Sequence, residues 1–131
     1  MKTNEEDFIY GDLSYKIIGL AYGIFNEIGF VYYEKLYQKA LRIIFQKEGV
    51  AFKEQVKIPI TLKKHNKKVS NCYLDFLVDD KIILELKVGS RFKKENIDQI
   101  YSYLVQNDKK LGLLINFSRE GVKIKRIVNI R

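Results

Sequence analysis

The sequence contains few of the residues that cross-link a chain or bind soft metals. Cys72 is the only cysteine, so no disulfide can form within the chain, and we expect a reducing, cytoplasmic setting. His65 is the only histidine and lies in a lysine-rich turn. A metal site built on histidines and a Cys–His catalytic pair are therefore not expected.

Long apolar runs and glycine-rich phosphate loops are also missing. No apolar segment approaches the ~20 residues that a membrane-spanning helix requires. Residues 1–7 lack the apolar core of a signal peptide. There is no Gly-rich Walker motif, so the sequence does not indicate nucleotide hydrolysis of that kind.

The composition predicts one folded domain with a basic surface. Apolar residues make up 47% of the 131 residues, which suffices for a single core, and we expect a polar tail over residues 1–11 and one domain over residues 12–131. The net charge of +8 favours an acidic partner, most commonly nucleic acid, although a lysine-rich soluble surface would give the same charge. The lysines expected to form a basic surface are Lys63, Lys64, Lys67, Lys68, Lys93, Lys94, Lys123 and Lys125.

Three segments repeat apolar residues at helical spacing: residues 13–28, 33–47 and 93–106. Asp12 and Ser14 are candidate N-caps of the first helix, because their side chains accept hydrogen bonds from free backbone N–H groups. The sequence therefore predicts two consecutive helices, followed much later by a third.

The first two helices carry features beyond their apolar stripes. Gly19 and Gly23 lie four apart and would leave a smooth face against which another element could pack. Glu34 lies in the first turn of the second helix, where the helix dipole alone favours an acid. The apolar stripe of that helix is expected at Leu36, Ala40, Ile43 and Ile44, widened by Tyr37 and Leu41.

Five segments are predicted to be strands. Pro59 lies in the first of them, and because proline donates no hydrogen bond to a ladder, we expect that strand at an edge or bulged. The element order is α-α-β-β-β-α-β-β, and a right-handed crossover through the third helix would make the third and fourth strands parallel neighbours in a mixed sheet. The strands are expected over residues 55–62, 69–78, 81–88, 110–117 and 122–130.

Charged residues interrupt the apolar hairpin formed by residues 73–87. Its first strand carries Asp75, the turn lies at Asp79-Asp80, and its second strand ends in Glu85-Leu-Lys87. Because side chains alternate along a strand, Glu85 and Lys87 point to the same face. An acid and a lysine at the end of a covered strand are costly unless they are compensated. A divalent metal beside the two carboxylates, with Lys87 facing a phosphate, would compensate all three.

The Asp…Glu-x-Lys pattern is weak by itself, and its context sharpens it. Two carboxylates on adjacent strands suit a hard ion such as Mg²⁺. Such an ion activates water and neutralises charge on a phosphate, while a lysine can stabilise the reacting phosphorus. The sequence therefore favours metal-assisted phosphodiester hydrolysis over acyl transfer.

Several separated motifs carry a family resemblance over nearly the whole chain. They are Ile28-Gly29, Glu34-Lys-Leu-Tyr-Gln-Lys-Ala-Leu41, Leu74-Asp-Phe-Leu-Val78, Ile83-Leu-Glu-Leu-Lys87, Gln99-Ile-Tyr-Ser-Tyr103 and Leu113-Leu-Ile-Asn-Phe117. Together they resemble the GxxExxY proteins, a small branch of the PD-(D/E)xK nuclease superfamily. Two positions depart from the pattern. Val31 replaces the glycine that gives the family its name, and Leu74 replaces the superfamily's proline before the aspartate.

The resemblance implies a role for each matching residue. Asp75 and Glu85 would bind Mg²⁺ or Mn²⁺, and Lys87 would be the catalytic lysine. Glu34 would reach the site from its helix, directly or through a water on the metal. The implied fold is a restriction-endonuclease-like α/β domain, so residues 12–131 would form one PD-(D/E)xK nuclease-like unit.

Residues of the third helix would contact the substrate. Gln99 and Tyr103 match a Q-x-x-x-Y element that some members of the superfamily place beside the active site, although an ordinary polar pair four apart would look the same. Lys93 and Lys94, at the start of that helix, are expected to meet the nucleic acid.

The expected function is a metal-dependent nuclease that cuts phosphodiester bonds in DNA. One alternative is a nucleic-acid-binding module that keeps the fold without turnover. The other is a protein-interaction domain whose basic surface meets an acidic partner. A homodimer, or a further protein partner, is left open by the sequence.

Overall fold

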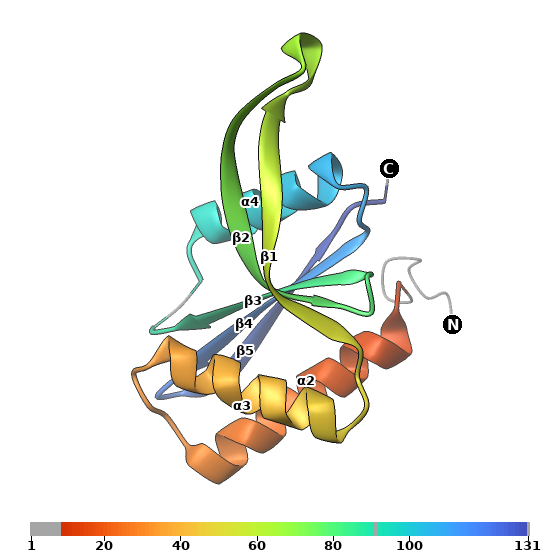
Figure 1. Cartoon of the computed structure of the whole chain (residues 1–131). Coiled ribbons are helices and arrows are strands. Elements are labelled where there is room, and N and C mark those ends of the chain that lie inside the picture. Colours follow the sequence, from red (N-terminus) through yellow and green to blue (C-terminus); the bar gives the residue numbers. More distant parts are fainter. Residues whose placement is uncertain (1–8, 91, 131) are drawn as a thin grey trace, which may run out of the picture.

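The computed structural model describes residues 9–90 and 92–130, and shows a mixed sheet flanked by helices on both faces (Figure 1). The predicted element order is confirmed. The helices are α2 (Gly11–Ile28), α3 (Glu34–Lys47) and α4 (Lys94–Gln106), with a short 3-10 turn, η1 (Lys63–His65). The strands are β1 (Phe52–Leu62), β2 (Lys67–Val78), β3 (Ile82–Val88), β4 (Leu111–Ser118) and β5 (Gly121–Val128). None of the described helices is long and apolar enough to cross a membrane.

The five strands lie in the order β1-β2-β3-β4-β5. β3 and β4 are parallel and are joined through α4, as the crossover rule predicts, while the other neighbours are antiparallel. β1, which contains Pro59, is an edge strand as expected.

Two apolar clusters hold the layers together, one on each face of the sheet. α2 and α3 pack on one face, where Tyr37 stacks on Phe117 with ring centroids 4.0 Å apart. α4 packs on the other face through Ile100, Tyr103 and Leu104. The central strand β4 is buried along its whole length, which matches its apolar sequence.

The turn between β2 and β3 fixes their register. Asp79 and Asp80 have positive φ angles of 51° and 56°, which Asp tolerates better than most residues, and the Lys81 N–H closes the turn by donating to the Val78 carbonyl at 2.9 Å. The ladder then runs from the Val78–Ile82 pair to the Phe76–Leu84 pair. Beyond this point β2 stays paired with β1, and the two strands curve away from the sheet as a long hairpin (Figure 1).

The start of α2 differs from the prediction. The helix begins at Gly11, after Tyr10 with a φ of 51°, so Asp12 and Ser14 lie inside it and cap nothing. Ser14 is instead buried, and its Oγ accepts a hydrogen bond of 2.8 Å from Arg126 Nη1. Ile9 and Tyr10, at the end of the predicted tail, pack half-buried against the core. Residues 1–8 of that tail lie outside the described residues.

The helix faces differ from the expectation at two places. Most of the predicted α3 stripe, including Tyr37 and Leu41, packs against the core. Ile43, however, is 51% exposed, and Phe45 is buried instead. Gly19 and Gly23 are exposed, and a Cβ added at either would meet no described atom within 4 Å. The smooth face of α2 therefore covers no neighbouring element among the described residues.

Gly112 of β4 is the glycine at which packing forbids a side chain. An added Cβ would lie 2.6 Å from Cγ2 of Ile100 in α4, so Gly112→Ala must displace the Ile100 side chain or the helix that carries it. We expect a loss of about 1–3 kcal/mol in the free energy of unfolding, measured by urea denaturation. Gly19→Ala, at an exposed helical position with open space, is the control and should add about 0.5–1 kcal/mol. Equal effects of the two variants would contradict this packing.

Candidate active site

The candidate site lies where β2 and β3 separate. In the register of the hairpin, Asp75 and Glu85 follow directly after the last pair, Phe76 and Leu84. The Asp75 N–H donates to Glu85 Oε1 at 3.0 Å, and the Leu86 N–H donates to Asp75 Oδ2 at 2.8 Å. Beyond the last ladder pair, each carboxylate thus accepts a main-chain N–H group from the opposite strand. This exchange holds the carboxylates side by side.

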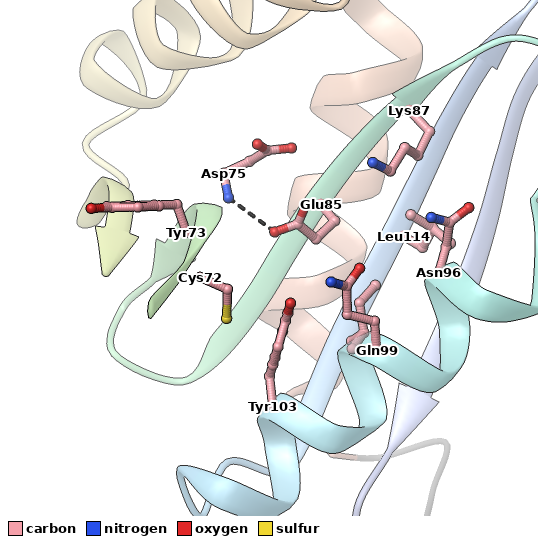
Figure 2. Close-up of a pocket in the computed structure, with 10 residues that line it drawn as sticks. Cys72, Tyr73, Asp75, Glu85, Lys87, Asn96, Gln99, Tyr103 and Leu114 are labelled. Atoms are coloured by element: carbon pink, nitrogen blue, oxygen red, sulfur yellow. Dashed lines mark hydrogen bonds between the residues drawn. The ribbon is translucent and has the colours of Figure 1, made fainter. Parts of the chain in front are cut away.

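The predicted strand residues line one cavity of about 240 Å³. Lys87 lies one pleat after Glu85, and Figure 2 shows its amine directed toward the two carboxylates. Gln99 and Tyr103 reach the same cavity from α4, and in the figure the Tyr103 hydroxyl points toward Glu85. The other lining residues are Cys72, Tyr73, Asn96, Ile100 and Leu114.

Burial dominates the electrostatics of the two carboxylates. It raises the pKa of Glu85 to about 8, and the negative charge of Asp75 contributes to that rise. Burial also raises the pKa of Asp75, opposed first by the Leu86 N–H and then by the positive charge of Lys87. The positive charge of Lys87 is thus too small to offset the burial of both carboxylates, and a further cation would favour their ionised forms.

The donor set fits a hard divalent ion that keeps part of its water shell. Asp75 and Glu85 offer carboxylate oxygens from two strands in one polar cavity. No group of three or more Asp, Glu, His or Cys side chains that could hold a metal occurs among the described residues. An ion held by one or two carboxylates, with waters completing its coordination, is typical of Mg²⁺ in proteins.

Glu34 lies beside this cavity without lining it. It is the first residue of α3 and is half-buried. Burial raises its pKa, the positive charge of Lys87 lowers it, and the charge of Asp75 raises it again. Glu34 therefore belongs to the same electrostatic group as the strand residues.

Gln38 was missed by the sequence reasoning. Its Nε2 donates to Asp75 Oδ1 at 3.1 Å, so both carboxylate oxygens of Asp75 accept hydrogen bonds. The available signal was its spacing: Gln38 follows Glu34 by four residues, which places both on one side of α3. Gln38 fixes the carboxylate that Glu34 approaches.

The polar residues of α4 differ in how deeply they are buried and in whether they line the cavity. Tyr103 is buried, and burial first, then the neighbouring Cys72 thiol, raises the pKa of its phenol, so the hydroxyl stays neutral and can donate. Gln99 lies one turn earlier on an exposed part of the helix. Lys93 and Lys94 are exposed at the start of α4 and do not line the cavity.

Comparison with known proteins identifies the family. Residues 11–127 match the sequence profile of the PD-(D/E)XK nuclease superfamily. The chain belongs to this superfamily. No curated protein matches the sequence.

Solved structures support the fold. SSO0001 aligns with a TM-score of 0.57 and 15% identity, over 72% of this chain and 49% of that chain. An alkaline exonuclease (LHK-Exo) from Laribacter hongkongensis aligns with a TM-score of 0.52 and 15% identity, over 72% of this chain and 55% of that chain. The aligned region is about half of each of these proteins. The predicted restriction-endonuclease-like α/β fold is confirmed.

Stability should depend on pH through Glu85. Its pKa is about 8 in the folded protein against an ordinary 4.5, so between these values the folded state holds a proton that the unfolded chain releases. The free energy of unfolding of the metal-free protein must then fall as pH rises through this window. We expect Glu85→Gln, which cannot ionise, to be more stable than wild type at pH 8 and to lose most of this slope.

The measurement is urea denaturation in chelator at about pH 5 and about pH 8, the two sides of the linkage window. Glu27→Gln, on the exposed side of α2, is the matched control and should keep the wild-type slope. A Glu85→Gln protein with an unchanged pH dependence would show that this carboxyl is not forced toward its neutral form.

Proposed function

We propose that this protein is a metal-dependent nuclease that hydrolyses phosphodiester bonds in DNA. The observation that carries the proposal is the convergence of Asp75, Glu85 and Lys87 in one polar cavity, at the place where two strands separate. Membership of a nuclease superfamily and the net charge of +8 both agree with a nucleic-acid substrate.

Asp75 and Glu85 are the residues that would hold the metal, Mg²⁺ or Mn²⁺. When bound, the ion neutralises charge on the phosphate and makes water a stronger nucleophile at neutral pH. The hydrogen bonds from Leu86 and Gln38 keep the Asp75 carboxylate in one orientation, so the metal site is organised before the substrate arrives.

The remaining polar residues act on the substrate and on water. Lys87 places a positive charge where negative charge develops on the phosphate oxygens. Glu34 would orient the attacking water or accept its proton, since its raised pKa makes it a better base than an exposed acid. Gln99 and Tyr103 supply neutral donors from α4 that would position the sugar-phosphate backbone.

Several finer assignments belong to the same proposal. The motifs from Glu34 to Tyr37 and from Gln99 to Tyr103 support placement among the GxxExxY proteins, with Val31 as the departure. DNA is proposed over RNA on that resemblance. A cytoplasmic location fits the single Cys72, and a homodimer would provide two active sites for two strands.

Cleavage of plasmid DNA tests the catalytic assignment directly. We expect wild type to cut in Mg²⁺ or Mn²⁺ and to be inactive in chelator, whereas Asp75→Asn and Lys87→Ala should each lower the rate by at least about a hundredfold. Asp79→Asn, in the turn that follows β2, is the matched control and should cut like wild type. Metal-independent cutting, or equal rates in all variants, would contradict the proposal.

One feature, the long β1–β2 hairpin, favours the alternative that the protein binds nucleic acid without cleaving it. Its tip carries a cluster of exposed lysines, and Figure 1 shows the hairpin extending away from the sheet. Such an arm would bind phosphates without contributing to hydrolysis. The lysines at this tip are Lys63, Lys64, Lys67 and Lys68.

Salt dependence distinguishes an arm that contacts nucleic acid from a merely solvated one. The double variant Lys64→Ala/Lys67→Ala should flatten the plot of log affinity against log salt concentration by about one unit per lost phosphate contact. Lys16→Ala/Lys47→Ala removes the same charge from exposed positions on α2 and α3 and should leave the slope nearly unchanged. The measurement is fluorescence anisotropy with labelled DNA. Equal slopes in both doubles would remove the arm from the interface.

A further inference from the structure

A second cavity, of about 300 Å³, opens beside the candidate active site. Three loops form it: the α2–α3 loop, the β3–α4 loop and the β4–β5 turn. Two of these loops follow the carboxyl ends of the parallel strands β3 and β4, where ligands commonly bind in α/β sheets. The lining residues are Phe30, Tyr32, Gly89, Ser90, Ser118, Arg119 and Glu120.

Two aromatic rings and a guanidinium face this cavity. Phe30 and Tyr32 pack edge to face with ring centroids 6.1 Å apart, and Tyr32 is 77% exposed. The Arg119 guanidinium lies over the Phe30 ring, 5.3 Å from its centroid. An exposed ring held beside a cation is the usual platform for a nucleic-acid base and its phosphate.

Two hydrogen bonds hold the main chain of Gly89 in the wall of the cavity. The Gly89 N–H donates to the Phe117 carbonyl, and Asn116 Nδ2 donates to the Gly89 carbonyl, both at 3.0 Å. Gly89 has a φ of +140°, a conformation that L side chains rarely adopt, and a Cβ there would lie 4.0 Å from the Tyr32 hydroxyl. Residue 89 is therefore glycine because of this backbone conformation, and space beside Tyr32 is not the constraint.

Among the described residues that line this cavity, Arg119 carries the positive charge available to a ligand. Glu120, the neighbouring acid, pairs with Lys123 at 3.3 Å. Arg119 forms no ion pair with any described residue. A guanidinium that keeps its N–H groups free while its face rests on a ring can bind a phosphate through them.

Short stretches of chain separate residues of the candidate active site from residues that line the second cavity. Gly89 follows Lys87 by two residues along β3, and Tyr32 precedes Glu34 by two residues at the start of α3. A strand whose phosphate lies at the candidate active site would therefore carry its neighbouring nucleotides toward the second cavity.

We propose that this second cavity binds one unpaired nucleotide of the strand being cut, with its base against Tyr32 and its phosphate at Arg119. The inference rests on the proposed nuclease function and narrows its substrate class. A base within a duplex is already stacked and cannot enter, so the site selects single-stranded or frayed nucleic acid next to the cut.

Equilibrium binding without divalent ions tests the site apart from catalysis. The probes are a labelled single-stranded oligonucleotide and the blunt duplex of the same sequence, followed by fluorescence anisotropy in chelator. We expect Tyr32→Ala to weaken binding of the single strand by about five- to a hundredfold, the usual effect of losing one base–aromatic stack, and to change duplex binding by less than about twofold. Tyr32→Phe should bind like wild type, because the ring is retained.

Arg119→Ala should weaken binding of the single strand and reduce its salt dependence, since a phosphate contact is lost. Tyr15→Ala removes an equally exposed tyrosine, 80% exposed at the other end of α2, and should have no effect. The inference is overturned if Tyr32→Ala binds the single strand as Tyr15→Ala does, if both probes weaken equally, or if wild type binds no single strand. Selective binding without metal-dependent cleavage would overturn the hydrolysis and leave the inference standing.

Discussion

The two hydrogen bonds that link Asp75 to Glu85 and Leu86 of β3 are the interaction on which the rest of the site depends. A central strand normally satisfies its N–H groups with neighbouring carbonyls, but β2 leaves β3 after the Phe76–Leu84 pair. Beyond that pair, the Glu85 carboxylate accepts the Asp75 N–H and the Asp75 carboxylate accepts the Leu86 N–H. Separation of the strands thus opens the cavity and fixes both acids within it. The diverging part of β2 becomes the hairpin that rises past α4 (Figure 1).

This arrangement concentrates unfavourable charge in one place. Burial raises the pKa of Glu34, Asp75 and Glu85 together, and Lys87 is the cation among them. Like charges gathered in a half-buried cavity are destabilising without a ligand, and such local cost is characteristic of functional sites. The apolar clusters on both faces of the sheet, together with the buried strand β4, stabilise the fold and offset this local destabilisation.

The sequence predicts the elements in this fold well and their faces less well. The apolar run before Glu85 and the Asp79-Asp80 turn are local signals, so the hairpin followed from them. One edge of the α3 face did not follow, because Ile43 and Phe45 are equally apolar and only tertiary packing decides which is buried. Gln38 and the cavity between three loops depend on contacts between distant segments, which periodicity does not encode.

The central claim is that one divalent ion binds between the carboxylates of Asp75 and Glu85. Crystals soaked in Mn²⁺ and measured at its absorption edge test this claim most directly, because anomalous scattering locates the ion without reference to activity. The account predicts one anomalous peak in contact with oxygens of both side chains, and its loss in Asp75→Asn crystals. A fully soaked crystal with no peak there, or with manganese bound only elsewhere, would contradict it.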